Sequence, residues 1–95
     1  MQCSSIEEIR EKIDSIDERT IRLIAERAEY VRQAAAFKKD ENGVKAPDRV
    51  KDVLEKVRKK ALEYGAPADI AENVYRNMIA GFINMELESF DKNKR

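Results

Sequence analysis

Arginine, lysine and carboxylate side chains supply most of the chemistry that this sequence could perform. The 95-residue chain has no histidine and one cysteine, Cys3. The commonest metal ligands are therefore scarce, and neither a Ser-His-Asp nor a Cys-His nucleophile can be assembled. A lone cysteine also cannot form an internal disulfide. We therefore expect a site that works through charge, hydrogen bonding and shape, without a metal or cofactor.

Three charged residues fall in apolar helical rows instead of on outer helix faces. Arg27 takes one step of the first row, and Lys38 follows 11 residues later, about 20° away around a continuous helix. Glu86 lies in an inward-facing row near the end of the chain. Burying such groups alone is costly, so each needs an opposite charge, a hydrogen-bond partner or a ligand.

Two interpretations of these charges compete. A cation in an apolar row usually snorkels or pairs with a glutamate, and Glu86 could be the buried partner of Lys38. Alternatively, Arg27, Lys38, Arg49 and Glu86 come from three helices around a common interior, as expected of a pocket for a small anion. Their convergence favours the pocket.

The first element that must position these residues is a long helix. Apolar residues recur at helical spacing from Ser4 or Ser5 to about Lys39, without glycine or proline, and Ser5 with Glu8 forms a plausible capping box. We predict one helix of about 35 residues, about 52 Å long.

Two further helices follow. Residues 40–46 (DENGVKA) are predicted to be a loop that breaks at Asn42-Gly43, Pro47 opens the second helix and Gly65 ends it. Ala66-Pro67 then begins the third helix. The prediction is a single all-α domain over residues 1–95, a three-helix chain with one very long N-terminal helix.

The length of the first helix predicts a partner chain. A compact chain of this size has a radius of gyration near ~12 Å, so the helix must project beyond it and leave its apolar stripe in water. Arg10 and Lys38 are 28 residues apart, about 42 Å along a continuous helix, so one chain cannot bring both to one small ligand. An antiparallel homodimer would let Arg10 reach the neighbouring site, giving two equivalent sites.

Composition argues against nucleic acid and membranes as partners and indicates the cellular compartment. The formal net charge is zero, so no overall field attracts nucleic acid or an acidic membrane. No apolar run approaches the roughly 18 residues of a membrane span, and residues 1–20 are too polar for a signal peptide, which favours the cytoplasm.

The sequence resembles the all-helical chorismate mutase family from about Ile6 to Phe90. The similar segments are IREKIDSID around Arg10, IAERAEYV around Arg27, AFKK around Lys38, APDRV around Arg49, and MIAGFINMELE around Glu86. The resemblance implies an intertwined homodimer in which Arg10 serves the neighbouring subunit's site.

The resemblance also implies a reaction, from the biosynthesis of aromatic amino acids. Chorismate, a small dianion, rearranges to prephenate by a pericyclic Claisen route that needs no nucleophile, metal or cofactor. Arg10 and Arg27 would hold its carboxylates and enforce the compact conformer. Lys38 and residue 86 would donate hydrogen bonds to the ether oxygen, and Arg49 would hold one end of the pocket. The remaining expected substrate contacts are Val50, Ile79, Phe82 and Ile83.

Two positions depart from the common pattern of this family. Many bacterial mutases have a glutamate that meets the ring hydroxyl where this chain has Val50, and APDRV is closer to the isochorismate pyruvate-lyases. Those lyases and many bacterial mutases have glutamine where this chain has Glu86, although some eukaryotic mutases have glutamate. A carboxylate cannot donate, so Glu86 would have to be protonated to serve the ether oxygen.

Three functional hypotheses follow. The first is a chorismate mutase, and the second is an isochorismate pyruvate-lyase on the same scaffold, either alone or together with mutase activity. The third is a non-catalytic helical interaction module whose stripe charges are interhelical salt bridges.

Overall fold

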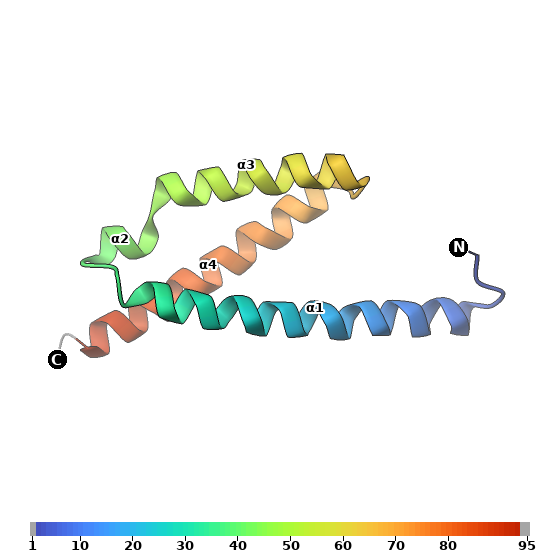
Figure 1. Ribbon diagram of the computed structural model, residues 1–95, viewed down its shortest axis with the longest axis horizontal. Coiled ribbons are helices and arrows are strands. Elements are labelled where there is room, and N and C mark those ends of the chain that lie inside the picture. Colours follow the sequence, from blue (N-terminus) through green and yellow to red (C-terminus); the bar gives the residue numbers. More distant parts are fainter. Residues whose placement is uncertain (1, 94–95) are drawn as a thin grey trace. The chain divides into compact units, whose positions relative to one another are not determined.

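The computed structural model describes the backbone of residues 2–93 and the side chains of residues 2–89, so the side chain of Phe90 lies outside it. Every regular element in this range is a helix: α1 (Ile6–Ala35), α2 (Glu41–Lys45), α3 (Pro47–Tyr64) and α4 (Ala68–Asn93) (Figure 1). The predicted all-α class is confirmed. None of these helices is long and apolar enough to cross a membrane. The chain divides into two compact units, one ending at Gln33 and one starting at Ala34.

The first turn of α1 is held by side-chain caps. The Glu8 backbone N–H donates to Ser5 Oγ at 3.1 Å, which confirms one half of the predicted capping box. The Glu8 carboxylate accepts from Ser4 Oγ at 2.7 Å and from the Ser4 backbone N–H at 3.0 Å. These two bonds, the hydroxyl first, lower the pKa of Glu8. Their stabilising effect is present above the pKa of the unfolded chain and is lost as pH falls through the folded-state value.

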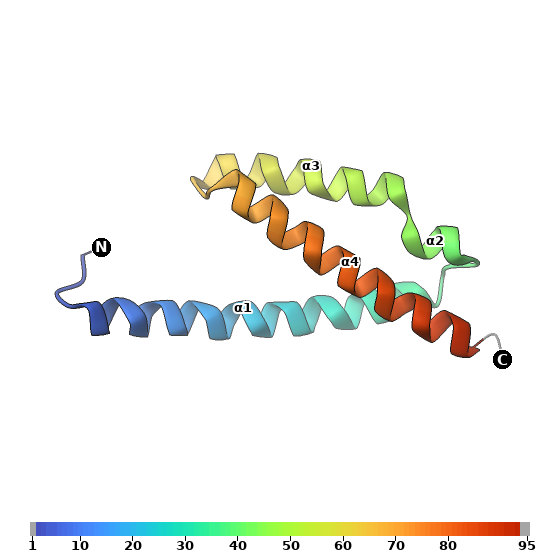
Figure 2. The same cartoon turned by 180° about the vertical axis from the view of Figure 1, so that it is seen from behind.

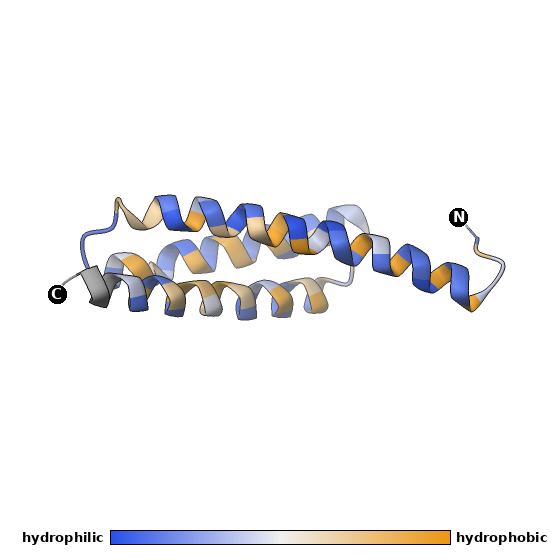
Figure 3. Cartoon of the chain, turned by 90° about the horizontal axis from the view of Figure 1, so that it is seen from below, coloured by the Kyte–Doolittle hydropathy of each residue, from blue (hydrophilic) through white to orange (hydrophobic). Residues whose placement is uncertain are grey.

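The apolar stripe of α1, whose members colour parts of this helix orange in Figure 3, is exposed along most of its length. Its large members have exposed fractions from 40% to 64%: Ile6, Ile9, Ile13, Ile16, Leu23 and Tyr30. A helix with such a stripe normally gains its stability by packing that stripe against another element.

The end of α1 lies at Ala35, and the predicted extension to about Lys39 is wrong. The N–H groups of Phe37 and Lys38 donate to Ala34 and Ala35 at 3.0 and 3.2 Å, so short three-residue turns close the helix. Lys38 therefore follows the helix, and the prediction that it shares a helical face with Arg27 is also wrong. The physical reason lies just downstream, where Asp40 takes an extended backbone (φ −152°, ψ 175°) to cap the next helix.

The predicted loop over residues 40–46 contains the short helix α2. Asp40 Oδ1 accepts from the Gly43 backbone N–H at 2.8 Å, and Val44 is buried with only 3% exposed. The cap and this apolar anchor outweigh the turn preference of Asn42-Gly43. Ala46 then takes the left-handed conformation (φ 38°) that turns the chain into α3.

The remaining boundaries follow the prediction closely. Helix α3 begins at Pro47 and ends before Gly65. The positive φ of Gly65, 72°, lets its N–H reach the carbonyls of Ala61 and Leu62. Helix α4 begins at Ala68, directly after Pro67. Within the unit from Ala34 onward, α4 packs against both α3 and α2 (Figures 1 and 2). The buried apolar residues of this unit are Val44, Leu54, Ala61 and Ile79.

Gly65 and Gly81 offer a matched test of the α3–α4 turn. A Cβ at either position would meet no heavy atom within 4 Å, but only Gly65 has a positive φ. We expect Gly65→Ala to lower the free energy of unfolding by about 1 kcal/mol, because alanine is strained in the left-handed region. Gly81 lies inside α4, and Gly81→Ala should raise the free energy of unfolding by about 0.5–1 kcal/mol. Urea denaturation at one fixed protein concentration measures both, and a stabilising Gly65→Ala would contradict the turn geometry.

Candidate active site

The structure brings Lys38 and Glu86 together across 48 positions of sequence. Lys38 Nζ donates to Glu86 Oε2 at 2.8 Å. The Glu86 side chain is only 6% exposed, whereas that of Lys38 is 24% exposed. The Glu86 carboxyl is thus nearly buried, whereas part of the Lys38 side chain stays exposed.

Local structure explains how these two side chains are placed. Lys38 lies in the short connection between α1 and α2, two residues before the Asp40 cap. Glu86 lies on α4, at helical spacing from Ile79, Phe82 and Ile83. Ile79 is buried, and Phe82 and Ile83 are half-buried. The apolar residues expected to contact a substrate therefore share the general face of α4 that carries the buried carboxylate.

Arg49 and Val50 open α3 but differ in their surroundings. Arg49 is 67% exposed and its Nη1 pairs with Asp52 Oδ2 at 3.4 Å. Lys56 pairs with the same Asp52 oxygen at 3.2 Å. Among the ion pairs of residues 2–89, Arg49 thus pairs along the surface of its own helix and not with Glu86. Val50 is half-buried.

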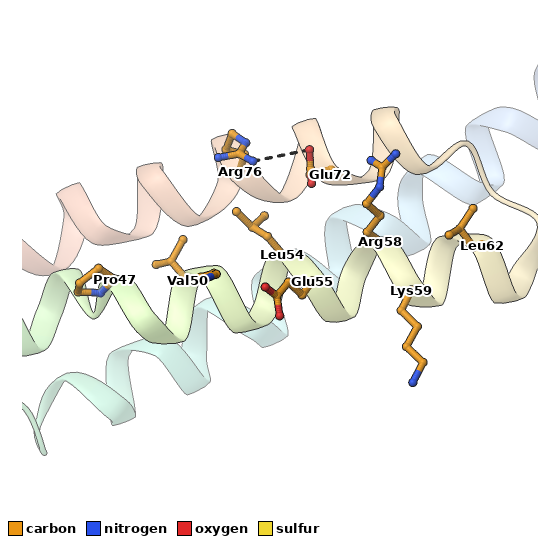
Figure 4. Close-up of a pocket in the computed structure, with 10 residues that line it drawn as sticks. Pro47, Val50, Leu54, Glu55, Arg58, Lys59, Leu62, Glu72 and Arg76 are labelled. Atoms are coloured by element: carbon orange, nitrogen blue, oxygen red, sulfur yellow. Dashed lines mark ion pairs between the residues drawn. The ribbon is translucent and has the colours of Figure 1, made fainter.

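A groove of about 590 Å³ runs between α3 and α4 (Figure 4). Apolar residues combine with a charged rim, in which Arg76 pairs with Glu72 at 3.6 Å. The lining residues are Pro47, Val50, Lys51, Leu54, Glu55, Arg58, Lys59, Leu62, Glu72 and Arg76. Val50 is the one predicted site residue among them.

Sequence reasoning did not single out the arginines of this groove. Arg58 and Arg76 occupy positions where solvated charges are expected on helix surfaces. Arg58 Nη1 bonds to Asp69 Oδ1 at 2.9 Å, and this bond, aided by the charge of Asp69, raises the pKa of Arg58. Both groups are well exposed, so the pair contributes little to stability.

Arg10 and Arg27 lie on α1, in the other unit, and are described separately. They are 17 residues apart in one continuous helix, which places them about 25 Å apart along its axis. Arg10 is exposed and Arg27 is half-buried. One copy of α1 therefore cannot present both guanidinium groups to the same small molecule.

Metal binding has no evident site in the described part of the chain. Over residues 2–89, no group of three or more histidine, cysteine, aspartate or glutamate side chains is placed to hold a metal ion.

Comparison with known proteins identifies the class of this chain. Residues 9–87 match the family described as chorismate mutase type II, a span that includes every predicted site residue from Arg10 to Glu86. The chain belongs to the chorismate mutase type II family.

Similar proteins in this family carry different names. An isochorismate pyruvate lyase of Pseudomonas aeruginosa is 31% identical over 86 residues, covering 90% of this chain and 85% of that protein. A chorismate mutase of Methanocaldococcus jannaschii is 32% identical over 73 residues, covering 76% and 74%. A bifunctional chorismate mutase/prephenate dehydratase of Aquifex aeolicus is 31% identical over 85 residues, which cover 85% of this chain and 24% of that protein.

The Asp40 cap provides a test of how the segment after Lys38 is held. We expect Asp40→Ala to lower the free energy of unfolding by about 1 kcal/mol, because the Gly43 N–H then loses its acceptor. Asp40→Asn keeps a side-chain oxygen at the same place and should cost much less. Urea denaturation of the two variants checks this, and equal losses would show that the charge of Asp40 matters more than its cap.

Proposed function

We propose that this protein is a chorismate mutase that converts chorismate to prephenate, with Lys38 as hydrogen-bond donor to the ether oxygen. The observation that supports this most is the Lys38–Glu86 ion pair, which joins a half-buried lysine side chain to a nearly buried carboxyl. Membership of the chorismate mutase type II family gives this pair its chemical context.

The chemistry suits the side chains available. In the rearrangement the ether C–O bond breaks as a C–C bond forms, and no proton, hydride or leaving group departs. The protein therefore has to hold one conformer and stabilise the negative charge that develops on the ether oxygen. An ammonium at Lys38 can do the second task, and arginines suit the first because guanidinium groups bind carboxylates in bidentate fashion.

The proposal includes an antiparallel homodimer. Arg10 and Arg27 are too far apart on one α1 to bind one substrate, and the exposed α1 stripe is of a kind that a second chain could cover. In a two-fold dimer, Arg10 of one subunit would complete the site that contains Arg27 and Lys38 of the other. Arg49, Val50, Ile79, Phe82 and Ile83 would provide the remaining contacts.

A specific observation also favours a second candidate, isochorismate pyruvate-lyase. The relative that bears this name is 31% identical and is matched over 85% of its length. Val50 offers no hydrogen bond to the ring hydroxyl, and isochorismate carries this hydroxyl at another carbon. The ether C–O bond would then break while the hydrogen on the hydroxyl-bearing ring carbon moves to the enolpyruvyl methylene, which releases pyruvate and leaves salicylate. The third hypothesis, a non-catalytic interaction module, would make Lys38–Glu86 a purely structural pair.

Separate incubation of the purified protein with chorismate and isochorismate tests these functions. We expect prephenate from chorismate, and salicylate with pyruvate from isochorismate would instead identify a lyase. Lys38→Ala should lower kcat by a factor on the order of 10². Lys39→Ala, at the exposed neighbouring lysine, is the matched control and should keep wild-type activity. Neither product from the wild-type protein would favour the interaction module.

Mixed dimers test the contribution of Arg10 to the neighbouring site. Arg10→Ala and Lys38→Ala should each be nearly inactive alone. When the two are unfolded together and refolded, half of the dimers contain one chain of each kind, and one of their two sites has both residues intact. Activity should then return to about a quarter of the wild-type value.

Two results would contradict the shared site. If Arg10 served its own chain, one site of each mixed dimer would lack Arg10 and the other would lack Lys38, and activity would not return. A stable and active monomer in analytical ultracentrifugation would exclude the shared site directly.

A further inference from the structure

We propose that Asp52 positions Arg49 in the free protein and competes with the substrate for its guanidinium group. Lys56 then retains the Asp52 carboxylate when Arg49 turns to the substrate. This inference rests on the proposed function, in which Arg49 contacts a dianion. It assigns a role to two residues that do not touch the substrate themselves and act through Arg49.

The three side chains form a row on the surface of α3. Arg49 and Lys56 are about two helical turns apart and therefore lie on the same face, with Asp52 between them. Asp52 Oδ2 pairs with Arg49 Nη1 at 3.4 Å and with Lys56 Nζ at 3.2 Å. Two cations thus share one carboxylate oxygen, and the proposed site uses one of these cations.

The pair with Arg49 is the weaker of the two. Its 3.4 Å contact is long for a charge-assisted hydrogen bond, for which about 2.7–2.9 Å is typical. Helix geometry also favours Lys56, because an acid interacts best with a base that follows it by one turn. Arg49 instead lies in the first turn of α3, at the positive end of the helix dipole. A substrate carboxylate can therefore take Arg49 from Asp52 while the pair with Lys56 remains.

The exposure of this row makes an exchange of partners easy. The side chains of Arg49 and Lys56 are each 67% exposed, and that of Asp52 is 51% exposed. An ion pair at such an exposure is weak, so little is lost when Arg49 exchanges it for a bidentate contact with a substrate carboxylate. Because Lys56 stays beside Asp52, its charge is not left unpaired near a dianion.

Steady-state kinetics of Asp52→Asn tests the competition. We expect KM for chorismate to fall by about two- to fourfold with kcat unchanged, because Arg49 no longer has to leave a carboxylate before it binds the substrate. Glu63→Gln is the matched control, since Glu63 pairs with Lys60 on the same helix at 3.3 Å and at the same spacing. It should leave KM unchanged. An unchanged KM in Asp52→Asn would overturn the proposal.

A double-mutant cycle shows whether Asp52 acts through Arg49 or through its charge alone. In an Arg49→Met background, Asp52→Asn should leave kcat/KM unchanged, because the side chain through which it acts is missing. If kcat/KM rises there by the same factor as in the wild-type background, Asp52 acts as a general negative charge, and its role as a positioning residue is excluded.

Lys56→Met tests the role of the second cation. We expect KM to rise by about twofold, because Asp52 loses this partner and holds Arg49 more firmly. In the Asp52→Asn background the same substitution should leave KM unchanged. A rise in KM that persists there would show that Lys56 attracts the substrate directly, contrary to the proposal. Lys60→Met is the matched control and should leave KM unchanged in both backgrounds.

Activity of the wild-type protein separates this inference from the proposed function. A protein that converts neither chorismate nor isochorismate would overturn both. A protein that converts one of them with the same KM as its Asp52→Asn variant would overturn this inference alone. Asp52 and Lys56 are exposed, so their substitution should leave the fold intact, and circular dichroism of each variant checks this.

Discussion

A carboxylate taken out of water has to be paired, and this requirement connects the parts of the unit that begins at Ala34. Glu86 is nearly buried on α4, and its partner comes from the connection that precedes α2. The pair therefore ties the start of the unit to its last helix, where Val44 on α2 and Ile79 on α4 are also buried. Breaking such a pair by removing one partner is far more costly than losing a surface ion pair. In the proposed site, the same contact would have both a structural and a chemical role.

A second constraint comes from helix geometry and concerns α1 alone. A rise of 1.5 Å per residue separates Arg10 from Arg27 by about 25 Å, however the rest of the chain is arranged. The two cations can serve one small anion only when they come from different copies. The apolar stripe of α1 leads to the same requirement, because its large side chains are 40–64% exposed along the helix. In the proposed dimer, the pairing of two subunits would both cover the stripe of α1 and complete the two sites.

The sequence predicted those features that depend on local chemistry. Ser5, Pro47 and Gly65 mark helix ends correctly, because a cap, a fixed φ and a permitted positive φ act within one turn. It did not predict that α1 ends at Ala35 or that α2 exists, since both depend on the Asp40 cap and on burial of Val44 against the rest of its unit. Likewise, charges in apolar rows indicated Lys38 and Glu86, whereas a groove between α3 and α4 cannot be recognised from residues that are solvated on each helix alone.

The two candidate reactions both break the ether C–O bond, and their substrates are isomers that differ in the position of the ring hydroxyl. Both substrates present an ether oxygen and two carboxylates, so the proposed roles of Lys38 and of the arginines on α1 would suit either one. Val50 offers no hydrogen bond, and an apolar contact discriminates poorly between isomers that differ in the position of one hydroxyl. Selectivity then depends on whether the hydroxyl of each isomer finds a polar partner elsewhere or is left desolvated. A buried hydroxyl without a partner costs about 1–3 kcal/mol, enough to set the preference between the two substrates without any change in the residues that do the chemistry.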